Sequence, residues 1–206
     1  MVTVAAFSAL PLGIALASSA SISTSHKCYA VGQSVGLTGR GFLGYSEYDL
    51  SVDGIDFGQS VTNASGGFRV SFGPGGLAAG QAQIVDKAIA SDGQSSASAI
   101  FTVTRTTGAL VGAGSGSSPH RTVPFEVWDF GRGVSIYVHW IGPNGVYVET
   151  ASLGSDGGQC GYLKTRPREL FPFNAASGNW TLQFDTHSRY SKHPSGRSAR
   201  ITASAG

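Results

Sequence analysis

The stretch GVSIYVHWIGPNGVYVE, residues 133–149, predicts a β-hairpin. Its first half alternates with the period of two that is typical of a strand. One face of this strand would carry Val134, Ile136, Val138 and Trp140. The other face would carry Ser135, Tyr137, His139 and Ile141. Pro143-Asn144-Gly145 then turns the chain, since Asn-Gly is a strong hairpin signal.

The composition of the whole chain agrees with a fold built from strands. The chain has 206 residues, of which 30 are glycine and only 13% are charged. That length is enough for one or two domains, each with its own core. Because long surface helices are usually rich in Glu, Lys and Ala, this composition disfavours them. We therefore predict an all-β protein.

Further strand-like runs are separated by turns that contain glycine. They lie at residues 34–38, 48–52, 67–72, 82–85, 99–103, 123–130 and 179–186. Short strands divided by regular turn signals are the pattern of a β-sandwich. Since residues 104–120, TRTTGALVGAGSGSSPH, suit a flexible connection, two sandwiches are expected.

The predicted organisation has four parts. Residues 1–20 form a signal peptide, residues 21–104 an immunoglobulin-like sandwich, residues 105–119 a Gly/Ser-rich linker and residues 120–206 a second sandwich. The signal is indicated by an apolar run without charges that ends in small residues, with cleavage after Ala17 or Ala20. No Lys or Arg precedes the apolar run, so a buried strand or helix is the alternative.

The immunoglobulin-like assignment rests on a resemblance. Its landmarks are Tyr29, VGQSV at 31–35, Gly-Phe at 41–42, VDG at 52–54, NASGGF at 63–68 and FTV at 101–103. In this order they resemble bacterial immunoglobulin-like repeats of exported proteins. The resemblance implies a spacer, adhesion or binding module without catalytic residues. The second half, with VHW at 138–140, QCGYLKTR at 159–166 and WTLQFDT at 180–186, resembles secreted actinobacterial proteins, and this likeness implies no activity.

Two cysteines, Cys28 and Cys160, lie one in each predicted domain. In an oxidising compartment they could form a bridge that clamps the domains together. The alternative is a pair of small, buried thiols, because Cα atoms more than about 7 Å apart cannot be bridged.

Candidate catalytic groups centre on His139 and Cys160. His139, Asp185 and His187 could form a catalytic or metal-binding group, but no G-x-S-x-G elbow or zinc-type histidine spacing is present. We expect His139 to be a half-buried strand residue. Cys160 with His139 would suit a small cell-wall enzyme, yet the Ser-His-Gly-Cys sequence of cysteine peptidoglycan transpeptidases is absent at residues 156–160. The prediction is therefore a protein that is not an enzyme, with no cofactor and no metal.

Basic residues gather in the second half. Residues 1–104 carry four Lys and Arg against six acids, a net charge of −2, and residues 105–206 carry ten against six, a net charge of +4. Lys164, Arg166 and Arg168 form one basic run. A second contains Arg189, Lys192, Arg197 and Arg200, with His187 and His193 between them.

These features predict a secreted or cell-surface bacterial protein that binds or spaces. The expected binding surface is Lys164, Arg166 and Arg168, and the expected partner is an anionic cell-wall polymer or an extracellular protein, not nucleic acid. An ordinary solvated basic surface is the alternative.

Overall fold

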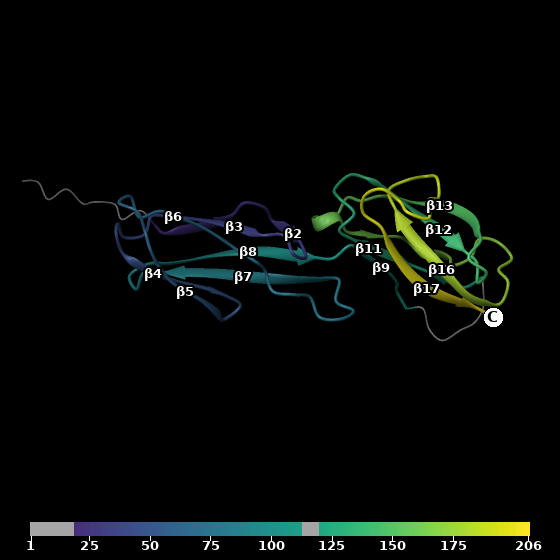
Figure 1. Cartoon of the computed structure of the whole chain (residues 1–206), viewed down its shortest axis with the longest axis horizontal. Coiled ribbons are helices and arrows are strands. Elements are labelled where there is room, and N and C mark those ends of the chain that lie inside the picture. The colour runs from purple at the N-terminus through teal and green to yellow at the C-terminus, as the bar shows by residue number, and fades with distance from the viewer. Residues whose placement is uncertain (1–18, 113–119) are drawn as a thin grey trace, which may run out of the picture.

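The structure is a computed structural model that describes residues 19–112 and 120–206. Within these residues the regular structure is all strand apart from the 3-10 turn η1 (Gln159–Gly161). The predicted all-β class is therefore confirmed. Two sets of strands lie end to end along the long axis of the molecule (Figure 1).

Two sheets form the first half. A three-stranded sheet has the order β1-β3-β6, and a five-stranded sheet has the order β2-β8-β7-β4-β5. The bounds are β1 (Ser21–Thr24), β2 (Cys28–Ala30), β3 (Val35–Arg40), β4 (Glu47–Val52), β5 (Ile55–Val61), β6 (Phe68–Phe72), β7 (Gln83–Ser91) and β8 (Ser96–Thr104). Side chains from both sheets, such as Leu37, Leu50 and Phe101, meet in one buried cluster. This half is a β-sandwich, with β2 parallel to β8.

The second half packs three small sheets around another cluster. Their orders are β13-β12-β16-β17, β14-β11-β9 and β10-β15. The bounds are β9 (Thr107–Leu110), β10 (Thr122–Val123), β11 (Phe125–Trp128), β12 (Ser135–Ile141), β13 (Tyr147–Ser155), β14 (Leu163–Lys164), β15 (Arg168–Glu169), β16 (Gly178–Asp185) and β17 (Ala199–Ala205). Val127, Trp140 and Phe184 belong to this core, which is separate from the first.

The hairpin predicted from residues 133–149 is present. β12 and β13 pair antiparallel, and the Gly142 amide donates to the Val146 carbonyl across the turn, with the Asn144 side chain accepting from the Val146 amide. The expected apolar face is correct, because Ile136, Val138 and Trp140 are buried.

The connection between the two halves differs from the predicted linker. Thr107–Leu110 is strand β9, which pairs with β11 of the second half. Only Arg105 and Thr106 separate it from β8. Four of the eight described residues of the expected linker are therefore strand, and this strand is held in place because Leu110 packs on the second core and Gly108 lies against Phe184. Residues 113–119 of the expected linker lie outside the described residues.

The predicted signal peptide lies almost entirely outside the described residues, since residues 1–18 are not among them. β1 begins at Ser21 and pairs with β3, and the partly buried Ala20 packs against the first core. The signal peptide and the exact domain boundaries stay predictions.

Candidate functional site

A disulfide joins the two halves. Cys28 begins β2 and Cys160 lies in η1, 132 residues further along the chain, and their Cα atoms are 5.4 Å apart. The sequence did not decide between a disulfide and two free thiols, and the structure contains the disulfide. Because Lys27 and Val31 also exchange backbone hydrogen bonds with β8, the segment around Cys28 is fixed to the five-stranded sheet of the first half.

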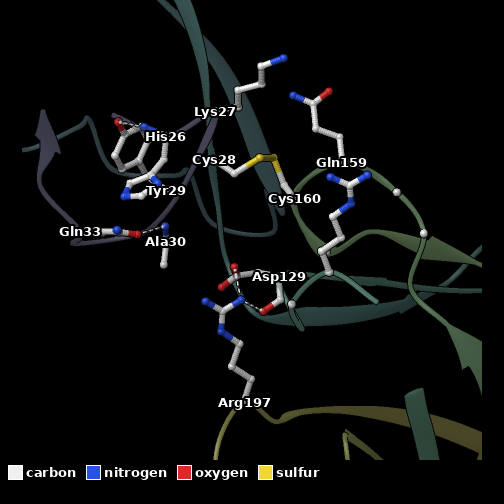
Figure 2. Close-up of a pocket in the computed structure, with 15 residues that line it drawn as sticks. His26, Lys27, Cys28, Tyr29, Ala30, Gln33, Asp129, Gln159, Cys160 and Arg197 are labelled. Atoms are coloured by element: carbon white, nitrogen blue, oxygen red, sulfur yellow. Dashed lines mark hydrogen bonds and ion pairs between the residues drawn. A yellow bond between two sulfur atoms is a disulfide. The ribbon is translucent and has the colours of Figure 1, made fainter. Parts of the chain in front are cut away.

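A cleft of about 590 Å³ opens beside this disulfide (Figure 2). Residues 26–33 contribute one wall, and loops around Asp129 and Gly158 contribute the other. Arg197 reaches in from the β16–β17 loop, and its Nη1 donates to the Asp129 carboxylate at 2.8 Å and to the Asp129 carbonyl at 2.6 Å. Residues from both halves of the chain therefore line the cleft.

Asp129 connects this cleft to the short connection between the halves. The Thr106 hydroxyl donates to its Oδ2 at 2.9 Å. Burial raises the pKa of the Asp129 carboxyl above its ordinary value, while the Thr106 hydroxyl and the Arg197 guanidinium oppose the rise. The sequence analysis did not single out Asp129, although the Asp-Phe-Gly-Arg-Gly run at 129–133 marks a tight turn where an aspartate tolerates its positive φ of 63°.

A second buried carboxyl lies behind the cleft. Asp156 Oδ1 accepts from the Gly158 amide at 2.9 Å. Burial is the main cause that raises the pKa of Asp156, and the nearby Arg132 acts in the opposite direction. This contact shapes the glycine-rich turn that presents Cys160.

His139 is more enclosed than predicted. Its side chain is fully buried instead of half-buried, with Nδ1 2.6 Å from Thr150 Oγ1 and Nε2 3.1 Å from Asp185 Oδ1. The physical reason is that two tyrosine rings cover the His139 side chain, and the alternation of residues along the strand does not predict this contact. Tyr147 and Tyr190 stack on each other with ring centroids 4.8 Å apart, and both rings pack edge-on against His139.

The group of His139, Asp185 and His187 that the sequence suggested does come together. His187 Nδ1 lies 3.8 Å from Asp185 Oδ1, and the His187 amide donates to the same oxygen at 2.8 Å. Among the described residues, no group of three or more His, Cys, Asp or Glu is arranged to hold a metal ion. The arrangement acts as a buried polar network.

Cys160 and His139 do not form a nucleophile–base pair. The Sγ of Cys160 is bonded to Cys28, and both ring nitrogens of His139 have other partners. A thiolate is required for nucleophilic attack, so the oxidised chain does not supply one at Cys160.

The predicted basic surface is partly neutralised. Lys164 Nζ lies 2.8 Å from Glu126 Oε1, and this contact raises the pKa of Lys164. Arg168 Nη1 donates to the Ser152 carbonyl at 2.7 Å. Arg166 is exposed. Within the described residues, Arg166 is thus the member of this run whose side chain makes neither an ion pair nor a hydrogen bond.

No protein-family model and no curated protein matches the chain. Over residues 19–112 and 120–206, no helix is long and apolar enough to cross a membrane.

Several solved structures are similar at low identity. A tetra-tandem repeat from the extending region of a large adhesion protein has 14% identity and a TM-score of 0.33, and covers 91% of this chain and 49% of that chain. The human OSCAR ligand-binding domain has 10% identity and a TM-score of 0.35, and the match covers 91% of this chain and 98% of that chain. A structure from a 1.5-MDa bacterial ice-binding adhesin has 13% identity and a TM-score of 0.32, and the match covers 90% of this chain and 63% of that chain. The chain thus spans about half of the adhesion-protein structure. TM-scores this low assign neither a family nor a function.

Proposed function

We propose that this chain is a non-catalytic module of the bacterial cell surface or extracellular space, which holds its two halves in a fixed orientation and binds an anionic envelope polymer. The observation that carries the proposal is the Cys28–Cys160 disulfide between the halves. Structural disulfides persist in oxidising compartments and are rare in the cytosol. The bridge therefore supports export, as the apolar N-terminal run also does.

The spacing role is supported by a second, very short link. Arg105 and Thr106 join β8 to β9, and both are held in place. The backbone amide of Arg105 donates to the Ala82 carbonyl, and the Nη2 of the Arg105 side chain donates to the Leu77 carbonyl. The Thr106 hydroxyl donates to the Asp129 carboxylate. Two covalent connections, one of them tightly hydrogen-bonded, restrict relative motion of the halves far more than a flexible linker would.

The binding role is supported by the charge of the second half. Its net charge of +4 favours anionic partners, and that attraction weakens as salt rises. The alternative of a cysteine enzyme is not favoured, because the disulfide occupies Cys160.

Co-sedimentation of the oxidised protein with isolated bacterial cell walls tests the binding role. We expect retention at low salt that is lost at high salt, and weaker retention for the triple variant Lys164→Gln, Arg166→Gln, Arg168→Gln. Lys87→Gln, which removes an exposed cation from the first half, is the matched control and should be retained like the unaltered protein. Retention that neither salt nor the triple variant changes would contradict a binding role based on this basic surface.

A further inference from the structure

The loop between β16 and β17 carries a cavity whose ionisable side chains are all basic. The cavity has a volume of about 420 Å³ and is lined by Lys192, His193, Pro194, Ser198, Ala199 and Arg200. We propose that it binds a phosphate group of an anionic polymer. This inference rests on the binding role proposed above and adds, beside the surface of Lys164, Arg166 and Arg168, a second basic site with a defined ligand chemistry.

Arg200 is held in position by neutral partners. Its Nε and Nη2 donate to Gln183 Oε1 at 2.9 and 2.6 Å, and Nη2 also donates to the Lys192 carbonyl at 2.7 Å. No partner for its Nη1 occurs in the part of the chain that the structure describes. The guanidinium therefore keeps a free edge and a positive charge that no directly bonded carboxylate neutralises.

The buried network described above supports this arrangement from within the sheet. Gln183 is fully buried, and its Nε2 donates to Asp185 Oδ2 and to the Ser191 carbonyl, both at 2.9 Å. Asp185 is in turn bonded to His139. Because each side chain fixes the next, the orientation of Arg200 and the path of the loop are set before any ligand binds. Such preorganisation lowers the cost of binding.

The side chains of Lys192 and His193, the two other basic residues of the cavity, are exposed, and neither makes an ion pair or a hydrogen bond among the described residues. Lys192 supplies a compact ammonium charge and Arg200 a planar set of donors, the two cations that proteins use to bind phosphate. Arg197 of the same loop differs, since Asp129 neutralises it.

Lys192, His193, Ser198 and Arg200 line this one space, so several donors can reach a single anion, and a phosphate offers more oxygen atoms to them than a carboxylate does. The cavity is open to solvent, so the group to which the phosphate is attached can extend out of it. We therefore assign a phosphate ester or diester as the ligand.

Titration of the oxidised protein, followed by amide NMR shifts, tests this assignment with inorganic phosphate, glycerol phosphate and acetate as probes. We expect both phosphates to shift residues around Lys192 and Arg200, and to bind more tightly than acetate. The double variant Lys192→Gln, His193→Gln should weaken phosphate binding about tenfold or more. Arg189→Gln removes an exposed cation of the same loop that does not line the cavity, and should change binding less than twofold.

Both altered positions of the double variant are exposed, so folding is not at risk, and Arg200→Gln serves as a second test if its spectrum stays folded. Acetate binding as tight as phosphate binding, or equal phosphate binding by the double variant and the unaltered protein, would overturn the assignment. Failure here combined with salt-sensitive wall retention would reject this cavity and leave the proposed binding role intact. Retention on phosphatidylglycerol vesicles without binding of soluble glycerol phosphate would also overturn the single-phosphate site, whereas binding of glycerol phosphate alone would support a polymer source.

Discussion

The buried pair of His139 and Asp185 links the four-stranded sheet of the second half to the loop between β16 and β17. Thr150 on β13, His139 on β12 and Asp185 on β16 bond in sequence across three neighbouring strands. Buried polar groups are costly unless every partner is present. Loss of one member should therefore cost more than loss of an ordinary surface hydrogen bond.

His139→Ala should lower the free energy of unfolding by about 2–4 kcal/mol, because it leaves the buried Asp185 carboxylate without one of its donors. Urea unfolding followed by fluorescence measures the change. Ser135→Ala, at an exposed position of the same strand, is the control and should stay within about 0.5 kcal/mol of the unaltered protein. Equal stability of the two variants would show that the network contributes nothing.

Asp86 on β7 makes stability depend on pH. Burial, followed by the hydrogen bond and charge of Asp53, raises the pKa of Asp86 from 3.8 to about 6. The folded state therefore holds the proton more tightly than the unfolded state does. The stability that comes from the protonated form is present below the unfolded value and is lost as pH rises through about 6.

Asp86→Asn should thus stabilise the protein at pH 8, by on the order of 2 kcal/mol, and change little at pH 4. Urea unfolding of both proteins at several pH values measures the difference. A difference that is the same at pH 4 and pH 8 would contradict the raised pKa.

At the scale of the elements, β9 decides where the second half begins. Gly108 on this strand faces the buried Phe184, and a Cβ added at Gly108 would lie 2.6 Å from the Phe184 ring. Since Phe184 is fully buried in a packed core, it has little room to move.

Gly108→Ala should therefore destabilise the protein by about 1–3 kcal/mol through overpacking. Gly76→Ala, where an added Cβ meets no atom within 4 Å, should have almost no effect. Thermal unfolding of both variants measures the difference in stability. If Gly108→Ala is as stable as Gly76→Ala, the position of β9 against Phe184 is contradicted.

The strands differ in how far the sequence could predict them. Alternation located β3, β4 and β6 to within a few residues, because their buried side chains follow the period of two. It also located β12 and β16, although their buried side chains alternate only in the first half of each strand and are continuous in the second. β5 was missed, since all seven of its residues are exposed and it lies at a sheet edge. β9 was missed because its glycine and small residues also fit a linker. The position of His139 was predicted, whereas its cover by Tyr190 depends on a loop whose path no periodicity encodes.

At the scale of the whole molecule, the disulfide ties together residues that are 132 positions apart. The sequence could place one cysteine in each half but could not supply the distance between them. A bridge that closes so long a loop restricts the unfolded chain strongly. Replacing both cysteines, in Cys28→Ser, Cys160→Ser, should lower the free energy of unfolding by about 3–5 kcal/mol. Denaturant unfolding of the variant beside the oxidised protein measures this, and an unchanged midpoint would contradict it.

The most direct test of the proposed clamp is the distance between the far ends of the two halves. Fluorophores attached through non-natural amino acids at the exposed Gln94, in the β7–β8 turn, and Val146, beside the β12–β13 turn, report it by single-molecule energy transfer. The oxidised protein should give one narrow distance distribution, which broadens after reduction or in Cys28→Ser, Cys160→Ser. Identical distributions with and without the disulfide, or free thiols at both cysteines in the protein isolated from its native source, would contradict the proposed clamp.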